Sequence, residues 1–401
     1  MRRGAGWLTV FAGHGRIINS IDEQKNGLMG ATRSAELLRT AHARPGITRA
    51  AAAHLLGMST GAATETVARL SRANLLAEVP AAPSGARGRP TTVLVPHPQG
   101  PLVLAAAITH ETWRIDVVEL GGKVLATEEG RHHGTDWPTV AAVLTAAVAA
   151  FRIRYEDRPR ALSLAVPGTV SPAHRLDAAT LRWRDTDLRE LWPDALVFVA
   201  GNDATLAASA ESRRGASVGA SVALHLRIEA GLGGAVIDHG TTLFGATGAA
   251  GEFGHMPFGD PAIACPCGAH GCWGTAVDGT ALARLLGRPA PRDQVTYARR
   301  LINATAPEPA ERAAVRSVAG ALGRGIAGLI NGIDADLVTL GGLGIDLLAA
   351  AREDVEAAYR AGLMAYRRDA PPPILPAALG DDGPIAGAAE EAWSALLVAL
   401  A

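Results

Sequence analysis

The sequence lacks the paired cysteines that stabilise secreted domains and the long uncharged apolar runs that form transmembrane helices. It has only three cysteines in 401 residues, and all three lie within eight positions. An odd number in one cluster excludes a disulfide framework and indicates a set of metal ligands in a reducing compartment. No run of 18 apolar residues is free of charge, which argues against a transmembrane helix. Lysine is almost absent, with Lys25 and Lys123 the two examples, so arginine supplies nearly all the positive charge.

The residues that are present are typical of a folded protein with several domains. Apolar residues make up 48% and charged residues 19%, which excludes a disordered chain. The length predicts two or three domains. Two arginines before an apolar stretch at 6–11 imitate a short signal peptide, but His14 and Arg16 follow at once and no small-residue cleavage site is present. We therefore expect a cytoplasmic protein in which residues 1–25 form a poorly defined N-terminal extension.

The net charge of −1 hides an asymmetry along the chain. Residues 1–100 hold 12 basic and 5 acidic residues, whereas residues 101–401 hold 26 and 34. A basic N-terminal part on an acidic body suits a domain that binds a polyanion, joined to a domain of another kind. Chance surface charge is the alternative interpretation of this count.

Three short helices are predicted in the basic part, spanning residues 32–42, 49–56 and 60–73. Thr48 and Ser59 are good N-caps for the second and third helices, and Gly57 makes the turn between them. We expect Leu55 and Leu56 to be buried on the second helix. The inward residues expected on the third helix are Ala63, Val67 and Leu70. A short helix, a glycine turn and a capped helix are typical of a helix-turn-helix, although an ordinary three-helix motif gives the same spacing.

Two alternating segments after these helices predict a wing. Residues 75–79 and 91–95 read as strands, and the segment between them contains Gly-Ala-Arg-Gly-Arg-Pro at 85–90. A hairpin tipped with Arg87 and Arg89 can reach the minor groove of DNA, where the negative potential is strongest. A solvated loop is the alternative.

The third predicted helix supplies the other candidate contacts with DNA. Thr60, Gly61 and Thr64 lie on its outer N-terminal face and are candidates for contacts with bases or phosphates. Arg69 and Arg72 are expected to meet phosphates, which adds affinity but little sequence choice. The predicted partner is double-stranded DNA.

The rest of the chain alternates strands and helices, as in an α/β fold. The predicted strands are 103–108, 113–120, 124–128, 162–166, 197–200, 222–226, 234–237 and 337–340, and the predicted helices are 139–152, 204–213 and 314–330. Polar residues and glycines follow several of the strands, and the carboxyl ends of strands are where open α/β sheets bind ligands.

The cysteine run at 265–272 is the strongest local signal. Cys265, Cys267 and Cys272 lie in a tight, glycine-bearing loop and offer three corners of a tetrahedral site. His255, ten residues upstream, and His270, inside the run, are the candidates for the fourth corner. Sulfur with imidazole selects zinc, and a closed site of four ligands is structural. Three reduced, unliganded cysteines are the alternative.

The combined motifs resemble the ROK family, which groups sugar-responsive transcriptional repressors with bacterial sugar kinases. The resemblance runs from about residue 26 to the C-terminus. Its motifs are the Gly-Arg-Pro of the wing at 88–90, Ala-Val-Pro-Gly at 165–168, Trp183, Asn-Asp-Ala at 202–204, Gly-Ala-Ala-Gly-Glu-Phe-Gly-His at 248–255 and the cysteine run. The resemblance implies an α/β fold: a two-lobed actin-like (ribonuclease H-like) body at 101–401, preceded by an all-α winged helix-turn-helix domain at 26–96.

The resemblance also implies roles for individual residues. Zinc would be held by His255, Cys265, Cys267 and Cys272. The residues that would meet sugar hydroxyls are Asn202, Asp203, Glu252 and His255. Asp203 matches the general base of the family's kinases and is expected to be vestigial here.

Departures from the family pattern favour a regulator over a kinase. The kinases open with Asp-x-Gly-x-Thr after the first strand, but Ala107, Thr109 and Glu111 stand at those three positions. The second phosphate loop, Gly-Thr-Gly-x-Gly in kinases, begins here with Glu229. A carboxylate at about 4 Å from a phosphate costs roughly 4 kcal/mol near a protein surface, so no bound ATP and no catalysis are expected. The alternative is that Arg227 neutralises one of the two carboxylates. Gly274 replaces a glutamate that usually holds a sugar hydroxyl.

These observations lead to three hypotheses. The first is a sequence-specific DNA-binding transcriptional regulator, a repressor in the usual case, whose degenerate body senses a sugar or sugar derivative as a homodimer or homotetramer. The second is an ATP-dependent ROK hexose kinase with an added DNA-binding head. The third is a regulator that binds no effector.

Overall fold

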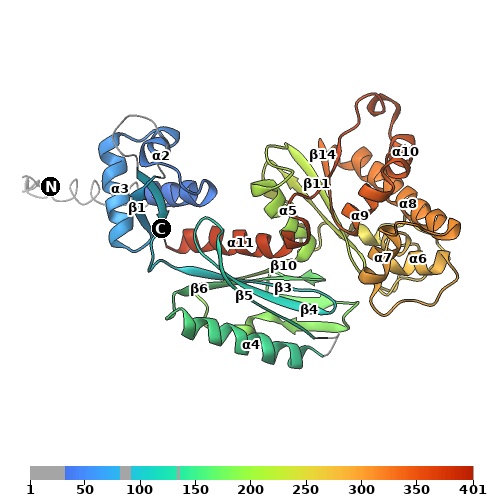
Figure 1. The fold of residues 1–401 in the computed structure, drawn as a ribbon, viewed down its shortest axis with the longest axis horizontal. Helices are drawn as coiled ribbons and strands as arrows, with labels where there is room; N and C mark the ends of the chain where they lie inside the picture. Colours follow the sequence, from blue (N-terminus) through green and yellow to red (C-terminus); the bar gives the residue numbers. More distant parts are fainter. Residues whose placement is uncertain (1–31, 82–91, 133–135, 401) are drawn as a thin grey trace, which may run out of the picture. The chain divides into compact units, whose positions relative to one another are not determined.

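A computed structural model of the chain describes residues 32–81, 92–132 and 136–400. The chain divides into two compact units, which part after Pro101. The last residues, from Leu396, belong with the first unit, and the second unit is Leu102–Ala395. Each unit is described by itself below (Figure 1).

The first unit has the helix-turn-helix arrangement that the sequence predicts. A helix over residues 32–43 is followed by α2 (Arg49–Leu55) and α3 (Thr60–Arg72). The Thr48 side chain accepts a hydrogen bond from the amide of Ala51, and the Ser59 side chain accepts one from Ala62. The two N-caps therefore fix where each helix begins.

The core of this unit differs from the prediction at one helix. Ala63, Val67 and Leu70 of α3 are buried as expected. Leu55, however, is 49% exposed and Leu56 is only partly buried, because α2 ends at Leu55 and turns Ala52 and Ala53 inward instead. Small residues at these two positions allow α2 to lie close to α3, as in other tight helix-turn-helix pairs.

The predicted wing strands are present. Strands β1 (Leu76–Pro80) and β2 (Thr92–Pro96) pair antiparallel, with Leu76 opposite Pro96 and Pro80 opposite Thr92. The side chain of Glu78 forms an ion pair with Arg49 of α2 at 2.9 Å, which links the wing to the helices. The tip, with Arg87 and Arg89, lies outside the described residues.

The second unit contains two five-stranded mixed sheets. The first sheet has the order β10-β6-β3-β4-β5 and the second has the order β13-β12-β11-β14-β15. The strands of the first sheet are β3 (Leu102–Ile108), β4 (Thr112–Val118), β5 (Val124–Arg131), β6 (Pro159–Val166) and β10 (Val197–Asn202). Those of the second are β11 (Val222–Ile228), β12 (Leu232–Asp238), β13 (Thr241–Thr242), β14 (Leu337–Gly342) and β15 (Ile374–Pro376).

The two sheets repeat one topology. In each, the first strand in the chain lies at the centre, its next two strands form an antiparallel meander on one side, and the last two add in parallel on the other. This repeated mixed sheet is the actin-like, ribonuclease H-like body that the motifs implied. A small sheet of β7 (Thr169–Val170), β8 (Arg175–Ala178) and β9 (Trp183–Asp187) is an addition that the sequence did not predict.

Helices cover both sheets. Helix α4 (Trp137–Arg154) shares a buried apolar cluster with strands of the first sheet, and α5 (Asp203–Arg214) packs on β11 and β12 (Figure 1). The core of the second sheet is shared with the long helix α8 (Pro309–Ile333). The remaining helices are α6 (Gly279–Leu285), α7 (Gln294–Ile302), α9 (Leu343–Ala350), α10 (Arg352–Gly362) and α11 (Gly383–Ala399), and the short 3-10 helices are η1 (Leu188–Leu191), η2 (Phe253–His255), η3 (Trp273–Ala276), η4 (Ala365–Arg367) and η5 (Gly380–Asp382).

Two of these helices, α4 and α8, are long and apolar enough to cross a membrane, judged by length and composition alone. In α8, 61% of an apolar stretch of 18 residues is buried inside the body. Its composition is therefore that of a core helix, which is apolar on most sides because neighbouring elements cover it.

Candidate functional site

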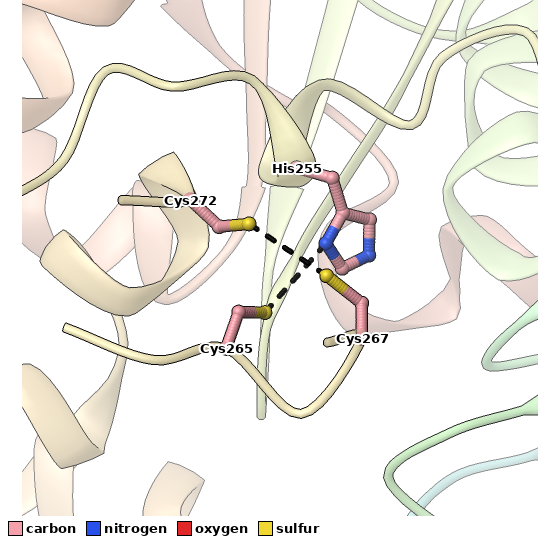
Figure 2. Close-up of side chains that lie close together, drawn as sticks. All are labelled: His255, Cys265, Cys267 and Cys272. Atoms are coloured by element: carbon pink, nitrogen blue, oxygen red, sulfur yellow. Dashed lines mark hydrogen bonds between the residues drawn. The ribbon is translucent and has the colours of Figure 1, made fainter. Parts of the chain in front are cut away.

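The three cysteines and His255 converge in space. One ligand atom from each lies within 4.8 Å of the other three. The Sγ atoms of Cys267 and Cys272 are 3.7 Å apart, and the Sγ of Cys265 is 3.7 Å from Nδ1 of His255 (Figure 2). Metal–sulfur bonds of about 2.3 Å at tetrahedral angles place sulfurs about 3.8 Å apart. The cluster therefore has the dimensions of a tetrahedral metal site.

Of the two candidate histidines, His255 lies beside the three cysteines. His255 belongs to the cluster, whereas His270 is exposed and outside it. His270 instead pairs through its backbone with Ala264, in a hairpin that brings the first two cysteines back toward the third. Gly268 makes this reversal possible, because its φ of +96° is one that other residues rarely adopt.

The local chemistry of the cluster favours a cation. Burial, together with the two neighbouring thiols, raises the pKa of the Cys272 thiol to about 12. Three thiols this close cannot all become thiolates at neutral pH without a positive charge between them, and a divalent metal supplies it. The residues present thus fit a metal ion.

The imidazole of His255 connects the metal cluster to the residues expected to bind sugar. Its Nδ1 faces Cys265, while its Nε2 is 3.7 Å from Oε2 of Glu252. Oε1 of Glu252 accepts a hydrogen bond of 2.8 Å from Thr169. A metal on Nδ1 would fix the ring, so that Nε2–H and the Glu252 carboxylate are held side by side for a hydroxyl.

Asn202 and Asp203 lie where β10 ends and α5 begins. The Asn202 side chain caps α5 by accepting from the amides of Ala204 and Thr205, and it donates to the carbonyl of Gly168 at 3.1 Å. Burial raises the pKa of Asp203, and Arg227 opposes this shift. Glu252 also raises the pKa of Asp203 through its charge, so the four predicted sugar contacts belong to one polar region of the body.

Arg227 pairs with Glu229, as the sequence left open. It is 6% exposed at the end of β11, and its Nη2 donates to Oε1 of Glu229 at 2.7 Å. Its Nε is 4.0 Å from Oδ2 of Asp203 and has no hydrogen-bond partner among the described residues. Only its position two residues before Glu229 signalled this role in the sequence.

The first of the two altered phosphate loops is closed by its own side chain. Oγ1 of Thr109 accepts from the amides of Glu111 at 3.3 Å and Thr112 at 3.0 Å. The amide of Thr109 donates to the carbonyl of Thr112 at 2.8 Å. Glu111 pairs with Arg131 at 3.3 Å. Backbone amides bind phosphate only when they are free to point at it, and these three amides are engaged.

The outer face of α3 carries most of the predicted DNA contacts. Thr60, Gly61, Thr64 and Arg72 are all exposed. Arg69 departs from the prediction: it is half-buried, and its Nε and Nη2 donate to Oγ of Ser34 at 3.2 and 2.8 Å. It lies next to Thr66 and Leu70, which are on the buried side of α3. Its contact with Ser34 of the first helix makes it part of the packing of the unit.

A family comparison assigns the body. The model for the ROK family matches residues 108–393. The chain belongs to the ROK family. The match covers the second sheet, the first sheet apart from most of β3, the cysteine cluster and the polar region around Asp203 and Glu252.

Curated relatives within the ROK family include both kinases and a repressor. A glucokinase from Streptomyces coelicolor is 30% identical over 203 residues, which cover 49% of this chain and 58% of the relative. The xylose repressor of Bacillus spizizenii is 24% identical over 235 residues, covering 57% and 60%. A glucokinase from Halalkalibacterium halodurans is 34% identical over 111 residues, covering 27% and 34%. The chain thus spans between a third and three fifths of the length of these relatives.

Solved ROK structures share the fold. A ROK family transcriptional regulator, a homologue of the E. coli MLC protein, superimposes with a TM-score of 0.73 at 22% identity, covering 92% of this chain and 98% of that one. A ROK family glucokinase from Streptomyces griseus, in complex with glucose and AMPPNP, gives 0.63 at 24% identity, covering 73% and 99%. The regulator alignment therefore extends over a larger share of this chain than the kinase alignment does.

Proposed function

We propose that the protein is a sequence-specific DNA-binding transcriptional regulator, a repressor, whose ROK body senses a sugar or sugar derivative. The observation that carries this proposal is the capped helix pair with its wing strands, attached to a body whose first phosphate loop is closed. The fold of a ROK regulator over 92% of the chain supports it. We place the protein in the cytoplasm, as a homodimer or homotetramer, with residues 26–96 as the DNA-binding domain and 101–401 as the effector domain.

In this proposal α3 is the helix that enters the major groove. Thr60, Gly61 and Thr64 would contact bases or nearby phosphates, because they are exposed on its N-terminal turns. Arg72 would meet phosphate, and Arg87 and Arg89 would reach the minor groove. Arg69 keeps only an indirect part, since it holds α3 against the first helix through Ser34.

The body would bind the effector through Asn202, Asp203, Glu252 and His255, with a zinc ion held by His255 and the three cysteines. The ion would act structurally by orienting the His255 ring next to Glu252. Effector binding changes DNA affinity only by its different affinity for two arrangements of the protein. The alternative is a body that binds no effector. It would be excluded if a sugar raised the melting temperature of the protein and had no such effect on the Glu252→Ala variant.

The DNA proposal is tested by fluorescence anisotropy with fragments upstream of the protein's own and neighbouring genes, with and without candidate sugars. Arg72→Ala should weaken binding and reduce the slope of log K against log salt by about 0.9, as the loss of one phosphate contact predicts. Arg352→Ala is the matched control, because it removes the same charge from an exposed site on α10. If no fragment is bound specifically, or if both variants behave alike, the proposal is wrong.

A kinase with a DNA-binding head is the second candidate, because Asp203 is retained and curated relatives are glucokinases. A coupled ATPase assay with common hexoses separates the two. Sugar-dependent turnover that is lost in Asp203→Asn would establish the kinase.

A further inference from the structure

The metal cluster lies partly at the surface of the body. Cys272 is buried, Cys265 is half-buried and Cys267 is exposed. Cysteines that sense oxidants are accessible to solvent and lie next to a second thiol that can complete a disulfide. The thiolate is the form that binds metal, and it is also the form that reacts with oxidants. Cys267 is therefore exposed to a reaction that its burial would have prevented.

Cys272 is the thiol that lies next to Cys267. The two Sγ atoms are 3.7 Å apart, a contact that Figure 2 marks. A disulfide holds its sulfurs about 2.0 Å apart, so an approach of about 1.7 Å is enough to join them. The chain has three cysteines in all, so Cys265 is the one competing partner within the chain.

The backbone supports the two sulfurs differently. Cys272 is the N-cap residue of η3, and the next residue, Trp273, is fully buried in the core of the second sheet. Cys267 instead lies on an exposed turn, directly before Gly268 with its φ of +96°. Gly271, with a φ of +71°, closes the connection to Cys272. Glycines at both ends of this connection let the turn adjust, so Cys267 can approach while Cys272 keeps its place.

Cys265 is the poorer partner for Cys267. Only Pro266 separates the two, and its ring fixes the backbone φ between them. The backbone of Cys265 is also held on both sides: its amide donates to the carbonyl of Ala269 at 2.8 Å, and its carbonyl accepts from the amide of Gly268 at 2.9 Å. The geometry therefore favours a bond between Cys267 and Cys272.

We propose that Cys267 and Cys272 form a peroxide-sensitive dithiol, whose oxidation to a disulfide opens the metal cluster. The Cys267 thiolate attacks one oxygen of hydrogen peroxide, the O–O bond breaks, hydroxide leaves and the sulfur becomes a sulfenic acid. The Cys272 thiolate then attacks this sulfur, the S–O bond breaks, and a second hydroxide leaves as the S–S bond forms. Two electrons pass from the two sulfurs to one peroxide, and a thiol reductant reverses the change.

The disulfide would remove two of the four metal ligands. Cys265 and His255 remain, whereas a structural zinc site uses four ligands. The loss of the ion frees the His255 ring, whose Nε2 lies 3.7 Å from Oε2 of Glu252. Oxidation therefore reaches the residues proposed to hold the effector. This last consequence rests on the proposed function, but the dithiol itself does not.

The test uses the full chain, loaded with zinc and treated with a small molar excess of hydrogen peroxide. A chromogenic chelator follows released zinc, and fragment-ion mass spectra of alkylated peptides locate the cysteines that are joined. We expect a disulfide between Cys267 and Cys272, one zinc ion released per disulfide, and recovery of both thiols with dithiothreitol. No disulfide, a disulfide that includes Cys265, or a disulfide without release of zinc would overturn the proposal.

The three serine variants provide matched controls, because each removes one metal ligand. Cys265→Ser should still form the disulfide. Cys272→Ser should stop at the sulfenic acid on Cys267, which dimedone traps, and Cys267→Ser should lose the rapid reaction with peroxide. If Cys265→Ser blocked the disulfide, or if Cys267→Ser reacted as fast as the unaltered protein, the assignment of the pair would be wrong. These measurements use neither DNA nor sugar, so their failure is distinct from a failure of the proposed function.

Discussion

The metal cluster gives the most decisive prediction. We expect the purified protein to contain one zinc ion per chain, measured by plasma mass spectrometry after exhaustive dialysis. Cys272→Ser removes the most buried ligand, which is 1% exposed, and His255→Ala removes the nitrogen ligand. Both variants should bind the ion more weakly and lose it on dialysis, because water must then replace the fourth protein ligand.

The expected size of the stability effect follows from linkage. Free zinc at 100 times its dissociation constant stabilises the folded state by about 2.7 kcal/mol. Unfolding entropy is about 2.1 cal/mol/K per residue, so a unit the size of Leu102–Ala395 should melt about 4 °C lower without the ion. Differential scanning calorimetry with and without a chelator measures this shift. The stabilisation free energy grows by about 1.4 kcal/mol for every further tenfold in affinity for zinc.

His270→Ala is the matched control for these variants, because His270 lies in the same loop but outside the cluster. It should keep both the zinc and the melting temperature. If the purified protein held no zinc, or if His270→Ala lost it as readily as Cys272→Ser, the assignment of the four ligands would be wrong.

Two further predictions concern buried carboxylates of the body. Burial raises the pKa of Asp278 to about 6, above its value of 3.8 in the unfolded chain. The protonated Asp278 side chain therefore makes its full contribution to stability below pH 3.8, and this contribution is lost as the pH rises through 6. Asp278→Asn keeps the N-cap of α6 and should raise the free energy of unfolding by up to about 3 kcal/mol at pH 7. The gain should be much smaller at pH 4.5. Urea titrations at the two pH values measure it, and an equal gain at both would contradict the prediction. Glu211 is fully buried and accepts from the amides of Ala216, Ala378 and Leu379 at 2.6, 3.1 and 2.7 Å. Glu211→Ala should lower the free energy of unfolding by about 3–6 kcal/mol. Glu211→Gln should lower it by about half as much, because the remaining carbonyl oxygen can still accept from two of the three amides. A loss below 1 kcal/mol for the alanine variant would show that these hydrogen bonds do not stabilise the fold.

Elements with a strong period or a clear cap could be predicted from the sequence. The N-caps Thr48 and Ser59 marked both helices of the helix-turn-helix, and the apolar segment at 162–166 marked β6 within a few residues. These signals are local, so they can be recognised in the sequence without knowing the tertiary contacts. The strands β7, β8 and β9 were missed because they are short and largely polar, and their pairing with one another is set by the surrounding body.

The candidate site was predictable where ligand chemistry dictates spacing. Three cysteines within eight residues indicated a metal cluster, but only the fold separated His255 from His270. The inward turn of Arg69 could not be read from its position, because a long arginine can face either solvent or a neighbouring helix. Leu55 was misplaced for a related reason: in a seven-residue helix two alanines are enough to form the buried face.

The two phosphate loops are equivalent in the repeated topology, since each follows the central strand of its sheet and leads into the antiparallel neighbour. The sequence suggested that Glu111 and Glu229 oppose ATP by charge repulsion. Both carboxylates, however, have an arginine partner, Arg131 at 3.3 Å and Arg227 at 2.7 Å, which cancels much of the repulsion. The expectation of weak nucleotide binding therefore depends less on charge repulsion and more on the first loop, where Thr109 accepts hydrogen bonds from the backbone amides of Glu111 and Thr112.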